Sequence, residues 1–123
     1  MAKVSIKMSS KDIEFATFYV GGALCGIDIL NIQEINKHFE ITKVPQASDY
    51  VKGILNLRGR IVTIIDLGKK LGLTDVNKGK NNRNNRNIIV NSEDEHIGLL
   101  VDSISDVALA KEEDIEPAPS NIG

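Results

Sequence analysis

The segment Gly53–Leu67, GILNLRGRIVTIIDL, constrains the fold of this chain more than any other stretch. Two apolar runs, Ile54–Leu57 and Ile61–Ile65, flank the triplet Arg58-Gly59-Arg60. The second run is rich in β-branched residues, which suit the pleated surface of a sheet. A glycine between two such runs supplies the positive φ of a tight reversal. The pattern predicts a β-hairpin with its tip at residues 56–60 and its two strands at the centre of a core.

The tip of this hairpin is charged, with Arg58 and Arg60 on either side of the turn glycine. Arginines on hairpin tips are commonly just solvated, since long charged side chains are rarely buried. A rigid apolar base would also hold such an arginine in place for a partner. The chemistry of the residues leaves both interpretations open.

The composition is that of a soluble globular protein, with 123 residues, 41% hydrophobic and 26% charged. This length suits one domain or two very small, merged ones. Aromatic residues make up only 4%, and there is no Trp, so the core is expected to be aliphatic. A single cysteine, Cys25, fits a reducing compartment. The polar start and the lack of an apolar run of about 18 residues predict a cytoplasmic protein without membrane insertion.

The remaining segments predict short strands. Residues 14–20 and 23–29 form an expected hairpin around Gly21-Gly22. Asp28 is a candidate cap for a short helical turn reaching Ile35, for which a strand is the alternative, and residues 41–44 suggest a brief strand that Pro45 stops.

After the central hairpin, Asp66 can cap a short helix over Leu67–Leu71, which Gly72 ends. Residues 74–87 are rich in Asn and basic residues and predict a loop. Strands are expected at 87–90 and 97–101, joined by an acidic turn, then an amphipathic segment 102–107 and a strand 108–115. Two groups of short strands, about 14–67 and 87–116, indicate small β-barrels or a sandwich.

The charge is uneven along the chain. Residues 1–91 hold 14 Lys and Arg against 8 Asp and Glu, whereas residues 92–123 hold 1 against 9. Such asymmetry concerns partners rather than fold. An RNA-binding barrel using Arg83 and Arg86 is disfavoured, because the basic loop has no aromatics for stacking and no basic helix.

No group of residues in the sequence forms a recognisable catalytic, cofactor or metal site. His38 and His96 lack a partner at metal-ligand spacing, and surface histidines explain them. The glycine-rich and nucleophile motifs of nucleotide-binding proteins and hydrolases are missing. Residues 112–116 lack the alternation and the glycine of a calcium loop. The chemistry indicates a non-enzymatic interaction domain.

Three collinear blocks give the chain a strong resemblance to the chemotaxis coupling protein CheW family. They are residues 14–35, EFATFYVGGALCGIDILNIQEI; residues 51–67, with the family's specific Asn-Leu-Arg-Gly; and residues 96–119, HIGLLVDSISDV with the later IEPAP. Departures within the blocks are mild: Ser48 and Thr63 replace frequent prolines, Cys25 a frequent aromatic, and Gly68 a frequent arginine.

The resemblance implies an all-β fold with short helices, in which two small five-stranded β-barrels pack together. Residues 1–123 would be one CheW-like domain: 14–67 the first barrel core, 68–87 the short helix and basic Asn-rich loop, and 88–123 the second barrel. Family members continue for some tens of residues past this point, so the second barrel is expected to be incomplete at its C-terminus. An unclosed barrel leaves an open strand edge, which predicts distortion or self-association there.

The resemblance also implies a function: a non-catalytic cytoplasmic adaptor without cofactor that links chemoreceptor tips to the histidine kinase CheA through its regulatory domain. Carried over by position, the receptor-facing residues are Ile32, Glu34, Ile35, Gly53, Asn56, Arg58 and Gly59. Arg58 would fork onto carboxylates or carbonyls, and Ile32 and Ile35 would supply the apolar anchor. Asn56 has an alternative role, which is to hold the turn by bonding backbone groups. Gly53 and Gly59 also have an alternative role, in which they serve the backbone conformation alone.

A different assignment is a CheW-like regulatory fragment of a larger signalling protein, either a kinase or a receiver-fused adaptor. The Met1 start and the polar leader favour a free-standing chain.

Overall fold

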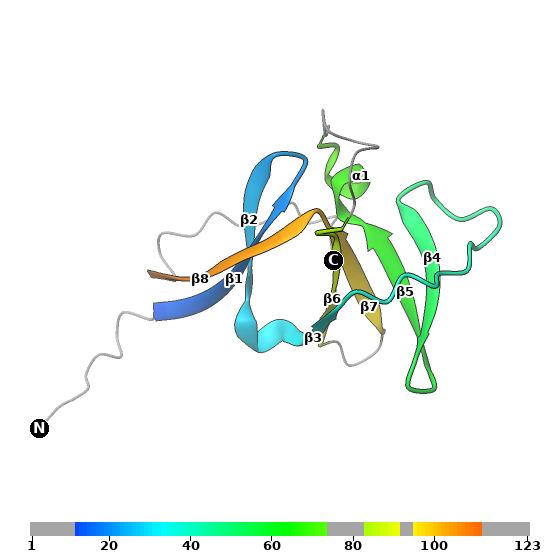
Figure 1. Cartoon of the computed structure of the whole chain (residues 1–123), viewed down its shortest axis with the longest axis horizontal. Helices are drawn as coiled ribbons and strands as arrows, with labels where there is room; N and C mark the ends of the chain where they lie inside the picture. The colour runs from blue at the N-terminus through cyan, green and yellow to red at the C-terminus, as the bar shows by residue number, and fades with distance from the viewer. Residues whose placement is uncertain (1–11, 74–82, 92–94, 112–123) are drawn as a thin grey trace, which may run out of the picture.

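The computed structural model describes residues 12–73, 83–91 and 95–111, and most of them lie in β-strands (Figure 1). The elements, in chain order, are β1 (Asp12–Val20), β2 (Ala23–Asp28), the 3-10 helix η2 (Ile29–Asn31), β3 (Ile32–Asn36), β4 (Val51–Leu57), β5 (Arg60–Asp66), α1 (Leu67–Leu71), β6 (Arg86–Val90), β7 (Ile97–Val101) and β8 (Ser103–Lys111). The described residues contain no helix with the length and apolar character needed to cross a bilayer.

Within these residues the strands form two sheets, which lie side by side in Figure 1. One has the order β2-β1-β8 and the other the order β3-β6-β7-β5-β4. Neighbouring strands are antiparallel except β5 and β7, which run parallel. Each sheet combines early and late strands, because β1 pairs with β8 and β5 with β7. The predicted all-β class is confirmed.

Neither sheet of the described residues is a closed barrel; the second barrel was expected to be incomplete, but the first was expected to be whole. The smaller sheet has three strands there, too few to curl into a barrel. The larger sheet has five, but its edge strands β3 and β4 are not paired with each other. The chain between them crosses this side and pairs with β4 only through a bridge of Thr42 to Ile54, with N···O distances of 2.9 and 2.8 Å. A sheet with one such bridge stays open along the rest of that side.

Two clusters of buried aliphatic residues form the core. One joins β1, α1, β6 and β7 through Phe18, Val20, Leu67, Ile88 and Val101, and so connects the two sheets. The other lies within the five-stranded sheet and consists of Leu55, Leu57, Val62, Ile64 and Ile89 from β4, β5 and β6. Successive strand residues point to opposite faces, so Ile88 and Ile89 place β6 between the two clusters.

The local signals around the central hairpin were sufficient to predict its structure. β4 and β5 pair antiparallel from Val51–Ile65 to Leu57–Arg60, as the apolar runs predicted. Asp66 caps α1 by accepting a hydrogen bond from the Lys69 amide at 3.2 Å, and Gly72 ends the helix in the left-handed conformation. The strand pair at 86–90 and 97–101 also forms.

Two local predictions fail. The helical turn that Asp28 caps covers only Ile29–Asn31, and Ile32 to Asn36 is extended instead, because β-branched isoleucines suit a strand and β6 pairs with this segment. Residues 41–44 form no strand beyond the Thr42 bridge. The predicted amphipathic segment 102–107 is part of β8, which begins at Ser103. Most of the basic loop, the acidic turn at 92–94 and residues 112–116 lie outside the described residues.

Candidate functional site

The tip of the β4–β5 hairpin places an arginine in a conformation that arginine rarely adopts. Arg58 and Gly59 both have positive φ, 53° and 83°. Two positive values in a row match the tight hairpin turn that follows the right-handed twist of the strands. The left-handed region costs a non-glycine residue roughly 1–2 kcal/mol. The sequence pattern predicted the positive φ for Gly59 but not for Arg58.

Asn56 stabilises this turn from the last part of β4. Its Oδ1 accepts a hydrogen bond from the Gly59 amide at 3.1 Å. This contact matches the backbone-holding alternative for Asn56, in which the side chain satisfies a turn amide. The side chain is itself exposed, so the hydrogen bond does not bury it.

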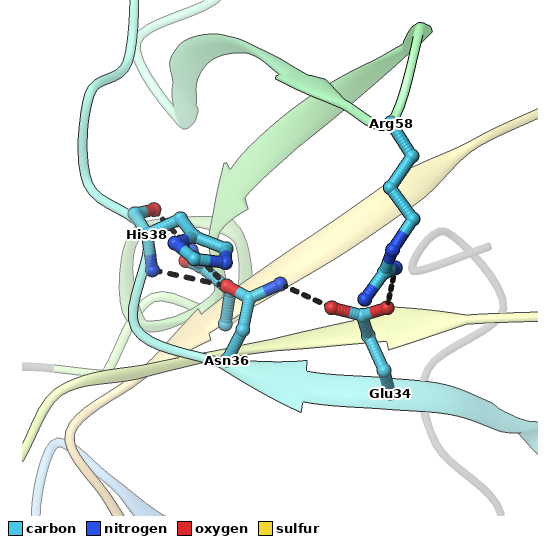
Figure 2. A network of polar contacts seen from close by, with 5 residues as sticks. Glu34, Asn36, His38 and Arg58 are labelled. Atoms are coloured by element: carbon cyan, nitrogen blue, oxygen red, sulfur yellow. Dashed lines mark hydrogen bonds and ion pairs between the residues drawn. The ribbon is translucent and has the colours of Figure 1, made fainter.

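The turn directs the Arg58 guanidinium towards the edge strand β3 (Figure 2). There Nη1 donates to Oε1 of Glu34, which lies 24 residues earlier in the chain. The arginine side chain is 71% exposed and the glutamate 21%, so the ion pair lies at the surface. The hairpin tip and β3 are therefore tied together although they belong to different parts of the sheet.

A chain of amides connects Glu34 to the interior. Its Oε2 accepts from Nδ2 of Asn36 at 2.9 Å, as Figure 2 shows. Asn36 Oδ1 accepts in turn from the His38 amide at 3.1 Å and from Nδ2 of Asn87 at 3.2 Å. Asn87 is fully buried and also donates to the His38 carbonyl at 2.7 Å. The hydrogen bond from Asn36, followed by that from Arg58, lowers the pKa of Glu34, so its carboxylate is charged at neutral pH.

Asn36 and Asn87 were missed by sequence reasoning. The available signal was an asparagine that opens the apolar run Ile88–Val90, where a buried amide needs partners. Its partner lies across the sheet, because Asn36 and Asn87 are opposite each other in the β3–β6 pair. That pairing cannot be derived from the local sequence.

The two candidate isoleucines of β3 differ in exposure. Ile32 packs against the cluster that joins the sheets, whereas Ile35 is 39% exposed. Ile35 directly follows Glu34 in the strand, so it presents an exposed apolar side chain on the face of β3 opposite to the ion pair. Ile32 instead packs β3 onto the core.

Gly53 has no side chain and its backbone is buried at the point where the chain crosses back to β4. Its φ is +150°, and a Cβ there would lie 2.3 Å from the Thr42 carbonyl oxygen and 2.6 Å from Cγ2 of Ile41. Glycine permits this close approach of two backbones. Its role in this structure is to hold the Thr42–Ile54 bridge.

Of the seven candidates, the structure links Glu34, Asn56, Arg58 and Gly59 by direct contacts and exposes Ile35 near them. Ile32 packs against the core, and the backbone of Gly53 is buried. We call the exposed part, Glu34, Ile35 and Arg58, the β3–hairpin edge. No group of three or more His, Cys, Asp or Glu side chains within residues 12–73, 83–91 and 95–111 is placed to hold a metal ion.

The model of the CheW-like domain matches residues 14–123 of this sequence. The chain belongs to the CheW-like domain family. It is 40% identical over 106 residues to the chemotaxis protein CheW of Klebsiella aerogenes, a match that covers 86% of this chain and 62% of that protein. It is 34% identical over 110 residues to the chemotaxis protein CheW of Helicobacter pylori, covering 89% and 65%. The chain thus spans less than two thirds of the length of these relatives.

A solved structure agrees with this family assignment. The scaffolding protein TtCheW from Thermoanaerobacter tengcongensis superposes with a TM-score of 0.78 at 35% sequence identity. The match covers 89% of this chain and 73% of that one. The strands of this CheW-like chain therefore follow an established family arrangement.

Proposed function

We propose that this chain is a non-catalytic cytoplasmic adaptor that couples chemoreceptors to the histidine kinase CheA in chemotaxis signal transduction. Membership of the CheW-like family and the likeness to proteins named chemotaxis protein CheW support the proposal. The alternative of a regulatory fragment of a larger signalling protein is not favoured by these relatives. The adaptor uses no cofactor or metal, and its partners are proteins rather than nucleic acid.

The β3–hairpin edge is the receptor-facing surface in this proposal. The observation that carries it is the fixed position of Arg58, held by a left-handed turn and paired with Glu34 while 71% of the side chain stays exposed. A guanidinium that donates from one nitrogen to Glu34 retains other N–H groups for carboxylates or helix-end carbonyls. Ile35, on the opposite face of the same strand β3, adds an exposed apolar side chain to this edge.

A binding experiment with two separate partners tests this function. The wild-type chain is immobilised and offered the cytoplasmic tip of a chemoreceptor, and in a parallel assay the regulatory domain of CheA. We expect both to bind. Arg58→Glu should weaken receptor binding about tenfold or more, as replacement of a central interface arginine does. Arg60→Glu, an equal charge change on the same hairpin, is the matched control and should bind normally.

The charge-swapped double variant Glu34→Arg/Arg58→Glu separates contact from support. It restores an ion pair between the strand and the tip but moves the positive charge onto β3. If Arg58 contacts the receptor, the swap does not restore binding. Wild type that captures neither partner would contradict the adaptor function, and normal binding by Arg58→Glu would contradict the assigned edge.

Self-association through β8 is a second part of the proposal. Among the described strands, β8 is one of the two edges of the three-stranded sheet. Leu109 is 69% exposed and Val107 55% exposed on it. A long edge strand with exposed apolar residues favours pairing with another chain.

A further inference from the structure

A hollow of about 310 Å³ lies where the chain between β3 and β4 crosses the open side of the five-stranded sheet. It is lined by Phe39, Ile41, Lys43, Lys52, Asn85 and Leu100. None of these residues belongs to the β3–hairpin edge. The hollow is thus a separate feature of the surface.

The floor of the hollow is apolar and continuous with the core. Ile41 and Leu100 are half-buried and pack against the core cluster of the five-stranded sheet. Phe39 is 43% exposed beside them, whereas Phe18 is 3% exposed. A partly exposed aromatic ring that lines a hollow offers a surface on which a partner's apolar side chain can pack.

The rim is positively charged. Lys43 and Lys52 are both exposed, and the side chain of neither forms an ion pair or hydrogen bond with another described residue. Phe39, Ile41 and Lys43 line the hollow at every second position, while Glu40 between them does not. Two ammonium groups beside an apolar floor complement a segment that carries carboxylates and an apolar side chain together.

We propose that this hollow docks an acidic segment of a partner protein, which inserts one apolar side chain onto Phe39, Ile41 and Leu100 and pairs its carboxylates with Lys43 and Lys52. The volume is at the low end for small-ligand sites, roughly 300–1,000 Å³. With 43% of Phe39 exposed to solvent, the hollow would leave much of a small ligand uncovered. It suits one or two side chains presented by a polypeptide. The inference does not rest on Arg58 or on the receptor assignment.

The test is an NMR titration of the full, ¹⁵N-labelled and methyl-labelled chain with the peptide Asp-Glu-Leu-Leu-Glu-Asp at low salt. We expect saturable shifts at the residues that line the hollow and weaker binding at high salt. Lys43→Glu/Lys52→Glu should weaken binding about tenfold, from two reversed surface pairs. Arg60→Glu/Lys69→Glu, with the same change in net charge, should bind like wild type. Phe39→Ala should also weaken binding, and its amide spectrum reports whether the fold is kept.

Control ligands test which chemical groups the hollow recognises. A peptide with both leucines replaced by serine, or with its acids replaced by amides, should bind at least several-fold more weakly. Equal binding of either control peptide, shifts confined to other residues, or no binding at all would overturn the proposal. Tighter binding of octanoate than of the peptide at the same residues would show a small-ligand site instead. Contacts of the hollow with the chain's own residues 112–116 would show an internal occupant and would also overturn it.

Discussion

Replacement of Gly53 by alanine should destabilise the fold far more than replacement of Gly59, although both glycines have positive φ. At Gly53 the new Cβ would lie 2.3 Å from the Thr42 oxygen and 2.6 Å from Ile41 Cγ2, both well inside van der Waals contact. At Gly59 it would meet no atom within 4 Å. Both variants force alanine into a positive φ, and only Gly53→Ala adds a clash.

The size of the effect follows from these two terms. A strained backbone conformation costs about 1–3 kcal/mol, and overpacking against a neighbour that cannot move costs about 1–3 kcal/mol more. Gly53→Ala should therefore lower the free energy of unfolding by about 2–6 kcal/mol. Gly59→Ala should lower it by about 1–2 kcal/mol, the left-handed cost alone. Domains of this kind have about 5–15 kcal/mol in total, so the first change is severe.

Urea unfolding followed by circular dichroism measures both variants against wild type, provided that the transitions are two-state. Amide hydrogen exchange adds a local measurement, because Thr42 and Ile54 donate to each other's carbonyls across the bridge. Their exchange should accelerate in Gly53→Ala and stay unchanged in Gly59→Ala. Equal destabilisation by the two substitutions, or unchanged exchange at the bridge, would refute the assignment of Gly53 to backbone packing. Loss of receptor binding in Gly53→Ala would then need a contact explanation.

Three further predictions concern a cap, a pH dependence and an edge. Asp66→Ala removes the side chain that accepts from Lys69 N and should cost about 1 kcal/mol in urea unfolding, whereas Asp66→Asn should cost little; equal costs would exclude the cap. The folded-state pKa of Glu34 is lowered, so its stabilisation is present above the ordinary glutamate pKa of about 4.3 and is lost as pH falls through the lower folded value. Wild type should be more stable than Glu34→Gln by under about 1 kcal/mol at neutral pH, because Arg58 is exposed. This difference in the free energy of unfolding should shrink below about pH 4. A constant difference from pH 7 to 3 would contradict the ion pair. Leu109→Lys, on the outer edge of β8, should reduce concentration-dependent association in sedimentation, and a wild type that stays monomeric throughout would argue against that edge.

The parts of the fold that the sequence predicts are those with local causes. Alternating apolar residues and a turn glycine specify the β4–β5 hairpin, and Asp66 and Gly72 delimit α1. The parallel pairing of β5 with β7 and the pairing of β1 with β8 join segments with no mutual signal in the sequence. The Glu34–Arg58 ion pair joins β3 to the tip of the β4–β5 hairpin, two segments that are not hydrogen-bonded neighbours in the sheet, so residue spacing could not predict it.

The candidate site divides in the same way. The resemblance to the CheW family supplied the positions, and local chemistry supplied the turn role of Asn56. The support of Glu34 by Asn36 and the buried Asn87 arises from the β3–β6 pair, and the exposure of Ile35 rather than Ile32 follows from which face of β3 meets the core. These distinctions depend on tertiary packing, which a single sequence does not display.

The pairing of β1 with β8 has a consequence for how the chain is made. Asp12 lies opposite Lys111, so the first described strand finds its outer neighbour 99 residues later. On a ribosome, β1 and β2 emerge early as a two-stranded ribbon, which is marginally stable at best in water. Phe18 and Val20 cannot be buried until α1, β6 and β7 have been synthesised. The edge of β1 that faces away from β2 cannot pair until β8 has been synthesised. Such distant closure predicts slow, late completion of the three-stranded sheet and a nascent chain that benefits from protection until synthesis has passed residue 111.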